Sequence, residues 1–367
     1  MSSFLGHIKD IPDPRVAGMV TYPLDGILPA ALVGVLCGAG EGEAVELRAR
    51  EYLPWLKRLL PYRCGIPQAP TFRKGFRLIT PAIREGGFAS WIASWQEIVR
   101  GGVAGDGKTR RGSKKAAGGS GALHLLSACA CEAGLVIGQR AVDGKSNAIK
   151  AISGLLEMLA ITGAIVSIDA MGAQKAIAAA MAAKEADYVL ALKRNQGALH
   201  EDGKTCFADA EGAAHCASGT TAAAGHGRIE ARTIRAPEAI DWLKERHPDW
   251  QNLRSVAAVT AKRSNQKTGE IGRETRFYIS SLAADPGAVL KAARAHWRID
   301  NNLHWQLDVA FDEDRCRTRK DFSPLNFAAV RHRALNLLNR DGCKLSLKRN
   351  RLKASVNARF RARLLAC

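Results

Sequence analysis

Apolar residues recur at helical spacing over residues 1–100. The run 27–36 is apolar throughout, and residues 45–60 carry apolar side chains three or four positions apart. A turn-rich stretch at 65–71 precedes the basic segment FRKGFRLI and a helix predicted to start at Pro81. The pattern predicts an all-helical domain over residues 1–100.

From Val103 onward the pattern favours strands. A short strand, VAGDGK, is followed by a predicted hairpin formed by HLLSACACE and GLVIGQRAV. An amphipathic helix over 146–159, the strand AIVSIDA, an alanine-rich helix over 174–186 and the strand DYVLALK complete the series. Three strands followed by helix, strand, helix and strand is the order of a ribonuclease H-like mixed α/β sheet, in which the first strand lies beside the fourth.

Residues 199–276 break this rhythm, because they are polar with period-two pieces such as RIEARTI and SVAAVTA. We interpret them as a β-rich insertion rather than a linker. The strand RFYISSL closes the insertion, a helix follows from Pro286 through Leu307, and further helices are predicted in the basic end. The predicted second domain is therefore 101–367, with the insertion at 199–276 and a basic segment at 315–367.

The chain is strongly basic, with a formal net charge of +19. Residues 315–367 hold fifteen Lys or Arg and two Asp, a net charge of +13, whereas residues 1–100 are nearly neutral. This charge favours a polyanionic partner over a small neutral metabolite. The nine cysteines include no C-x-x-C pair, and the most apolar segment, 27–40, is too short to span a membrane. We expect reduced thiols and a cytoplasmic location.

The stretch AIVSIDAMGAQ carries Asp169 directly after an apolar strand and before a turn of small residues. Acids at the carboxyl ends of α/β strands hold metals and phosphates, although an N-cap for the following helix explains Asp169 equally well. Asp106 also stands at a strand end, and the strand order predicts that the two acids are neighbours. Such a pair of carboxylates is suited to hold Mg²⁺ for two-metal phosphoryl chemistry.

The segment Gly102–Thr109 also fits the P-loop expression G-x4-G-K-T. A P-loop needs an apolar strand before it and a helix immediately after it. The preceding residues have helical periodicity, the following TRRGSKKAAGGSG disfavours a helix, and Asp106 would repel phosphate. A P-loop NTPase is therefore the less favoured alternative.

A third carboxylate is expected from the helix that follows the insertion. His296, Asp300, His304 and Asp308 recur every four residues and share one stripe of that helix, while the apolar residues between them pack inward. Asp300 is our choice for the third metal ligand. The alternatives are a solvated acid or a zinc site with the two histidines, although H-E-x-x-H spacing is missing. Asp308, Asp312, Glu313 and Asp314 are rival acids, of which Asp308 is the strongest.

Basic and amide side chains at predicted turns and strand ends are candidates to hold the phosphodiester backbone. The alternative for each of them is an ordinary solvated surface residue. The short basic helix after the turn at 65–71 is compatible with a DNA-reading helix pair, although a plain helical subdomain is the more favoured interpretation. The candidates are Arg73, Lys74, Arg77, Lys108, Arg110, Arg111, Lys145, Lys193, Arg194, Asn195 and Arg228.

Taken together, these segments resemble the DDE transposases of bacterial insertion sequences, in the branch of the H-repeat-associated proteins. The resemblance runs in order over nearly the whole chain. The matching segments are GIPQAPTFRKGF, GDGKTRRGS, GALHLLSA, VIGQRAVDGKSNAI, AIVSIDAMGAQKAIA, DYVLALKRNQ, GHGRIEAR, RFYISSL, HWRIDNNLHWQLDVAFDEDRCRTR and RHRALNLL.

The resemblance implies a ribonuclease H-like catalytic core, a transposase-associated N-terminal domain and a triad of acids that holds two Mg²⁺ ions, with Mn²⁺ as a substitute. Motif match assigns Asp106, Asp169 and Asp300 to the triad, although the family motif has Glu at the third position. The tyrosine, arginine and lysine that accompany this Glu in related transposases are not matched, because Ala293, His296 and Leu307 stand at their expected places.

The implied function is Mg²⁺-dependent cleavage of phosphodiester bonds at the ends of a mobile element and transfer of the freed 3′-hydroxyl into target DNA. The implied partner is double-stranded DNA, bound by a dimer or higher oligomer at the bacterial nucleoid. The Asp at position 300 keeps open a second alternative, a catalytically decayed element protein that only binds DNA.

Overall fold

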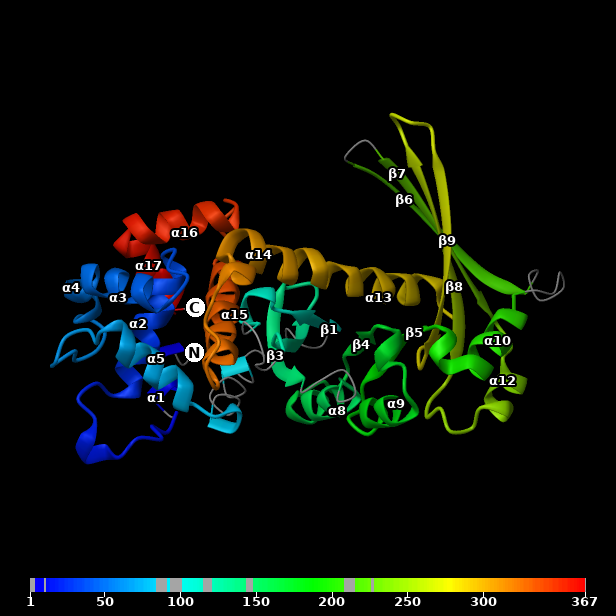
Figure 1. Cartoon of the computed structure of the whole chain (residues 1–367). Coiled ribbons are helices and arrows are strands. Elements are labelled where there is room, and N and C mark those ends of the chain that lie inside the picture. The colour runs from blue at the N-terminus through cyan, green and yellow to red at the C-terminus, as the bar shows by residue number, and fades with distance from the viewer. Residues whose placement is uncertain are drawn as a thin grey trace. The chain divides into compact units, whose positions relative to one another are not determined.

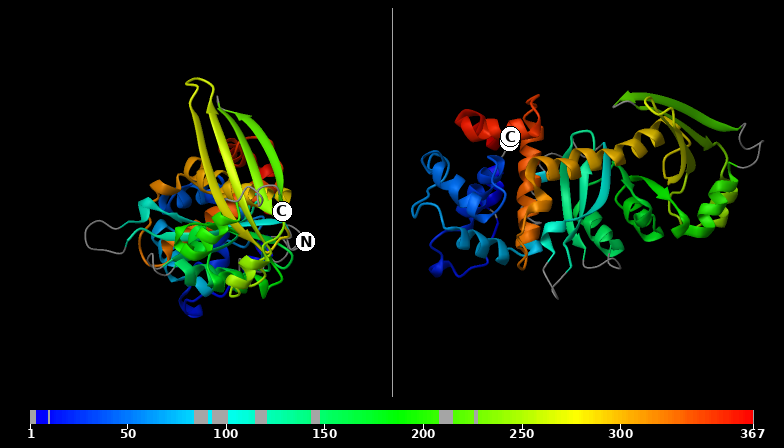
Figure 2. Two further views of the ribbon diagram at one scale, coloured as in Figure 1. Left: turned by 90° about the vertical axis from the view of Figure 1, so that its right-hand side faces the viewer. Right: turned by 45° about the horizontal axis from the view of Figure 1, so that its top comes forward.

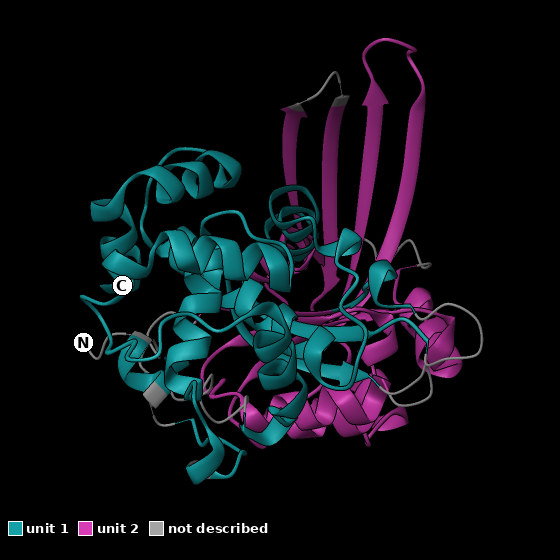
Figure 3. Cartoon of the chain, turned by 60° about the vertical axis from the view of Figure 1, so that its left-hand side comes forward, with its two compact units in different colours: residues 1–98, 107–145, 299–367 teal, residues 99–106, 146–298 magenta. Residues whose placement is uncertain are grey.

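The computed structural model describes residues 4–9, 11–83, 91–92, 101–114, 121–142, 148–207, 215–225 and 228–366. The chain forms two compact units (Figure 3). Unit 1 comprises residues 1–98, 107–145 and 299–367, and unit 2 comprises residues 99–106 and 146–298. The C-terminal helices thus group with the N-terminal ones, a division that cuts across the boundary predicted at residue 100.

Unit 2 is built on a mixed sheet whose strands follow the order β1-β4-β5-β9-β8-β7-β6. Strands β1, β4 and β5 run parallel, and the pairs from β5 to β6 are antiparallel. Strand β1 lies beside β4, as predicted. The strands are β1 (Gly102–Thr109), β4 (Ile165–Ile168), β5 (Asp187–Leu192), β6 (Cys216–Gly225), β7 (Arg228–Pro237), β8 (Ser255–Asn265) and β9 (Ile271–Ser280).

Helices cover both faces of this sheet (Figure 1). Helices α8 (Ala148–Met158) and α9 (Lys175–Ala182) lie on one face, and α13 (Pro286–Ile299) lies on the other. Helix α13 is amphipathic, and its Val289, Leu290 and Ala293 join a core with residues of β5, β7, β8 and β9. The buried stripe of α13 therefore fixes this helix against the centre of the sheet.

The predicted β-rich insertion consists of the long antiparallel strands β6 to β9 together with two short helices, α10 (Gly197–Thr205) and α12 (Asp241–Arg246). These strands extend well beyond the ends of β4 and β5 (Figure 2). Strands β7, β8 and β9 are buried at the end near β5, as Ile234 and Val256 show, and carry charged side chains such as Glu230 and Arg263 at the other end. In these three strands the change from buried to charged positions agrees with an insertion that projects from the sheet.

Unit 1 contains the predicted hairpin of β2 (His124–Ala130) and β3 (Leu135–Val142), in the strand order β3-β2-β1. The strand order β3-β2-β1-β4-β5 is that of a ribonuclease H-like sheet. The helices of unit 1 are α1 (Phe4–Lys9), α2 (Leu24–Leu36), α3 (Gly42–Glu51), α4 (Leu53–Leu56), α5 (Ala69–Leu78), α14 (Trp305–Phe311), α15 (Ser323–Arg340), α16 (Leu347–Val356) and α17 (Ala358–Ala366).

Helix α15 is the central element of unit 1. Its residues 323–338 are all buried, including Asn326, whose amide donates to the carbonyls of Phe76 and Ile79 in and just after α5. The side-chain oxygen of Asn336 accepts a hydrogen bond from the N–H of Val136 in β3, and its side-chain nitrogen donates one to the carbonyl of Val136. Buried polar side chains that are satisfied in this way fix which neighbours the helix accepts.

Within the described part of the chain, no helix combines the length and apolarity that a membrane crossing requires.

Candidate active site

Asp106 and Asp169 occupy equivalent positions on two neighbouring parallel strands. The register pairs Gly105 of β1 with Ile168, the last residue of β4, and in both segments the next residue is an aspartate. Asp106 was predicted at a strand end but lies within β1, which continues to Thr109, whereas Asp169 directly follows β4. Both preceding residues are buried, whereas both aspartates are partly exposed. The two strands therefore carry the carboxylates side by side from the core to the surface of unit 2.

The turn after Asp169 holds this carboxylate in place. Asp169 caps the short 3-10 helix Ala170–Gly172, and its Oδ1 accepts the N–H of Met171 at 3.2 Å. A Cβ on Gly172 would lie 2.2 Å from a methyl carbon of Ile168, so the tight turn requires glycine. The predicted N-cap role of Asp169 is confirmed for this short 3-10 helix, whereas Gln174 is the N-cap of the α-helix that follows, α9. The cap role of Asp169 is also compatible with metal binding, because one bond leaves most of the acceptor capacity of a carboxylate available.

A second loop is tied to the turn that follows Asp169. The Asn195 amide donates to the carbonyl of Ala170 at 2.6 Å, and the Gln196 amide donates to that of Ala173 at 2.9 Å. The sequence predicts Asn195 as a DNA contact, but its amide is used inside the protein. Asn195 and Gln196 therefore connect the end of β5 to the turn that presents Asp169.

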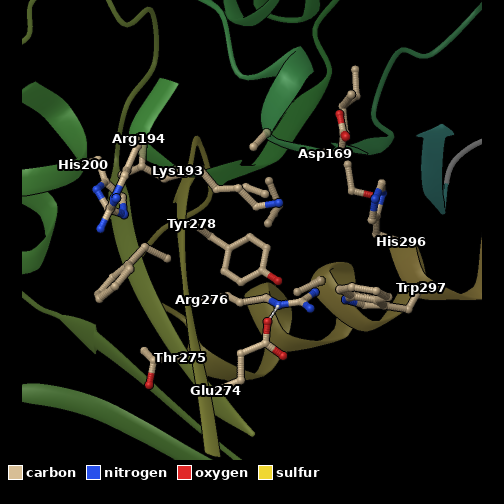
Figure 4. A pocket seen from close by; sticks show the side chains of 18 of the residues that line it. Asp169, Lys193, Arg194, His200, Glu274, Thr275, Arg276, Tyr278, His296 and Trp297 are labelled. Atoms are coloured by element: carbon tan, nitrogen blue, oxygen red, sulfur yellow. Dashed lines mark hydrogen bonds and ion pairs between the residues drawn. The ribbon is translucent and has the colours of Figure 1, made fainter. Parts of the chain in front are cut away.

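A pocket of about 530 Å³ opens beside Asp169 (Figure 4). The ends of β4 and β5, strand β9 and helix α13 contribute its walls. Its charged lining residues are Asp169, Lys193, Arg194, Lys204, Glu274 and Arg276. Four cations against two carboxylates make this pocket suited to the phosphates of a nucleic acid. Lys193 and Arg194, both predicted as DNA contacts, are exposed at its edge.

One wall of this pocket is preorganised by an interaction that the sequence did not reveal. The Arg276 guanidinium carbon lies 4.1 Å from the centre of the Trp297 ring, and its Nε donates to Glu274 at 2.7 Å. Sequence reasoning missed Lys204, Glu274, Arg276, Tyr278 and Trp297 as pocket residues. The alternation of ETRFY, which points Glu274, Arg276 and Tyr278 to one face of β9, is a signal that could have indicated these three residues.

Asp300 begins a break in the long helix. Helix α13 ends at Ile299, a π-helical segment spans Asp300–His304, and α14 follows. Asp300 is exposed, whereas Ile299, Leu303 and Leu307 are at most 1% exposed, as the stripe predicts. A π-helical turn is frequent at functional sites, so its position favours Asp300 among the acids of this helix. Asp300 belongs to unit 1 and the other two acids to unit 2, and its role as third ligand stays a prediction.

Two predicted DNA contacts have side chains that are used inside unit 1. Arg110 is 1% exposed and pairs with Glu313, so its side chain does not reach the surface of the unit. Lys108 is 14% exposed and pairs with Asp308, and its contact with DNA stays a prediction, as does that of Arg111, whose side chain is 88% exposed. Gly102–Thr109 is a strand along its whole length, so the P-loop alternative is wrong.

The other basic candidates lie in different places. Arg73, Lys74 and Arg77 lie on α5, where Arg73 pairs with Glu43 and Arg77 with Asp321. The opposite face of α5 is buried through Phe72 and Phe76, which leaves the basic face of this helix on the surface of unit 1. Lys145 and the side chain of Arg228 lie outside the described residues.

Comparison with known families identifies the chain. Residues 96–337 match the model of the "Transposase DDE domain", and residues 5–92 match that of the "DDE_Tnp_1-associated" domain. The chain belongs to the DDE transposase family. Asp106, Asp169 and Asp300 all fall within the matched DDE domain.

Relatives of this DDE transposase cover its full length. It is 36% identical to "Putative transposase YncI" of Escherichia coli O157:H7, over 100% of this chain and 95% of that protein. It is 33% identical to "H repeat-associated putative transposase YhhI" of Escherichia coli K12, over 100% of this chain and 98% of that protein. A solved structure, a piggyBac transposase synaptic complex with hairpin DNA, is 11% identical with a TM-score of 0.40, and the match covers 98% of this chain and 77% of that one. The predicted resemblance to the H-repeat-associated branch is confirmed.

Proposed function

We propose that this DDE transposase cleaves phosphodiester bonds at the ends of its own mobile element and joins the freed 3′-hydroxyl to target DNA. Asp106, Asp169 and Asp300 are the proposed acids of the reaction. The observation that carries the proposal is the β1–β4 register, which sets Asp106 and Asp169 side by side next to a cationic pocket. Because an element has two ends, we expect a dimer or higher oligomer on DNA of the bacterial nucleoid.

The chemistry of the two aspartates fits a hard divalent cation. Mg²⁺ prefers carboxylate oxygens, and it is usually held by one or two carboxylates together with substrate phosphates. When bound, Mg²⁺ or Mn²⁺ acts as a Lewis acid that promotes attack and stabilises charge on the leaving oxygen. Asp106 would hold the cation from within β1 and Asp169 from the position directly after β4, and Asp300 would complete the set from the π-helical segment.

The other residues of the pocket bind and orient DNA in this proposal. Lys193 and Arg194, directly after β5, would attract the phosphodiester backbone to the side of Asp169. Arg276 already has a fixed direction, because Glu274 and the Trp297 ring hold its guanidinium. Preorganised cations of this kind lose little entropy when a phosphate binds. The basic C-terminal segment would add affinity that depends on salt but not on sequence.

A second candidate function is DNA binding without catalysis. It is favoured by one observation, the Asp at position 300 where the family motif has Glu. Aspartate is one methylene shorter, so its carboxylate reaches less far from the helix. In this case the chain would recognise the element and leave it uncut.

The two candidates are separated by a cleavage assay on DNA that carries the inverted repeats flanking the gene. We expect the wild-type protein to nick this DNA with Mg²⁺ or Mn²⁺, and Asp300→Glu to nick it at least as fast. Binding of the repeats without cleavage by the wild type, together with cleavage by Asp300→Glu, would establish a decayed enzyme. Absence of cleavage by both proteins would contradict the proposed enzymatic function.

A further inference from the structure

Two segments of unit 1 that lie about 200 positions apart in the sequence are joined by ion pairs and close backbone packing. They are residues 108–112, at the end of β1, and residues 304–316, which include α14. Lys108 pairs with Asp308, and Arg110 pairs with Glu313 at 3.4 Å. Gly112 packs against the chain at Asp314 and Cys316, where a Cβ would lie 2.5 Å from either carbonyl oxygen. Residues 108–112 of the motif GDGKTRRGS therefore pack against the motif LDVAFDEDRC.

Glu313 is the buried residue at the centre of this contact between the two segments. Its side chain is 1% exposed and lies within 4 Å of nitrogen atoms of Lys108, Arg110 and Arg331. Burial alone would raise the pKa of Glu313, but the attraction of Arg110, Arg331 and Lys108 outweighs it and lowers the pKa below its ordinary value. A buried carboxylate that stays charged among several cations holds those cations in fixed positions. Glu313 thus limits where the Lys108 ammonium can lie.

Lys108 in turn binds the irregular part of the helix. Its Nζ donates to the Asp308 carboxylate, and it also lies 3.4 Å from the backbone carbonyl of His304. His304 is the last residue of the π-helical segment, and Asp300 is the first. A π-helical turn displaces the regular helical hydrogen bonds, so carbonyl groups near it need other donors. Lys108 supplies such a donor one turn after Asp300.

We propose that Lys108, backed by Asp308 and Glu313, is a positioning residue that stabilises the π-helical segment and thereby fixes the direction of Asp300. This inference rests on the proposed role of Asp300. It assigns an internal function to the basic residue of GDGK, which the motif alone suggests as a phosphate contact. The Lys108 side chain is 14% exposed, which agrees with an internal role.

Hydrogen–deuterium exchange tests this inference without any need for activity. We expect Lys108→Met, which keeps the length of the side chain but removes its charge and donors, to accelerate amide exchange in residues 300–311. Asp308→Asn should accelerate exchange in the same residues. The matched control is Lys244→Met, which removes an exposed lysine from a Lys–Asp pair on α12 and should leave this segment unchanged.

Cleavage and DNA binding then separate a positioning role from a phosphate contact. A positioning Lys108 predicts that Lys108→Met and Asp308→Asn each slow cleavage of bound DNA by about 10- to 100-fold, with DNA affinity unchanged. The double variant should be no slower than the slower single variant, because both changes break one interaction. The wild type is measured alongside, so that inactivity of the wild type counts against the proposed function and leaves the exchange result to decide the inference.

Three results would overturn the inference. One is unchanged exchange in residues 300–311 of Lys108→Met. Another is exchange that rises equally throughout unit 1, because this shows a general loss of stability. The third is a DNA affinity of Lys108→Met that falls and a salt dependence whose slope decreases by about one, because this identifies Lys108 as a phosphate contact.

Discussion

The side-chain amide of Asn195 donates a hydrogen bond to the carbonyl of Ala170, the residue that follows Asp169, at a distance of 2.6 Å. This bond and that of Gln196 to Ala173 join the loop after β5 to the turn after β4. The residues that attract DNA and the residue that holds the metal in our proposal therefore belong to one connected structure. Lys193 and Arg194 immediately precede this pair in the chain.

We predict that Asn195→Ala slows cleavage by about 10- to 100-fold, a cost typical of losing a residue that orients a metal ligand. Affinity for DNA should stay close to that of the wild type, because the amide faces the protein backbone. The measurement is single-turnover cleavage beside a DNA-binding titration. Weaker DNA binding with an unchanged rate for bound DNA would instead support Asn195 as a DNA contact.

For Lys193 and Arg194, at the cationic edge of the pocket, we predict an effect on DNA binding. We expect Lys193→Ala and Arg194→Ala to weaken DNA binding similarly for all sequences, and to reduce the slope of log affinity against log salt by about one each. A salt titration of each variant checks this. A slope equal to that of the wild type in both variants would show that neither side chain contacts phosphate.

Gly112 should tolerate no side chain. A Cβ at this position would lie 2.5 Å from the carbonyl oxygens of Asp314 and Cys316, and backbone atoms cannot easily yield. We predict that Gly112→Ala lowers the free energy of unfolding by about 1–3 kcal/mol. Chemical denaturation measures the change, and Gly272→Ala, at a position with open space, is the matched control. Equal stability of the two variants would contradict this packing.

The architecture could be predicted from sequence because it depends on patterns that are local. Period-two and helical spacing identify the hairpin of β2 and β3 and the helices around β4 and β5, and their order implies that β1 lies beside β4. The neighbouring positions of Asp106 and Asp169 follow directly from that order. The N-cap role of Asp169 also follows from local sequence.

The partners of basic side chains could not be predicted in this way. Lys108 and Arg110 stand in a basic, glycine-rich segment, and the acids that bind them follow about 200 residues later. Their burial depends on how two distant segments pack, which no local pattern records. Arg276 and Trp297 were missed for the same reason, because strand β9 and helix α13 meet only in the folded unit.

Burial of His332 makes the stability of the fold depend on pH. Burial lowers the pKa of His332 to about 3, whereas an unfolded histidine titrates near pH 6.5. Between these values the unfolded chain binds more protons than the folded chain, so the free energy of unfolding falls as the pH drops from about 6.5 toward 3. For this one group the slope is at most about 1.4 kcal/mol per pH unit.

We therefore expect His332→Gln to lose stability less steeply than the wild type between pH 6.5 and 4.5. Chemical denaturation at several pH values measures both slopes, and the difference between them isolates His332 from other groups. Parallel curves for the two proteins would contradict a neutral, buried His332.

The most direct test of the central claim is the Asp169→Asn variant in the cleavage assay on DNA with the flanking inverted repeats. The substitution keeps the shape of the side chain and can still cap the turn through its amide oxygen, but it removes the negative charge proposed to hold the cation. We predict that cleavage with Mg²⁺ or Mn²⁺ is abolished while DNA affinity and the free energy of unfolding remain close to those of the wild type. Cleavage by Asp169→Asn at the wild-type rate would contradict the proposal.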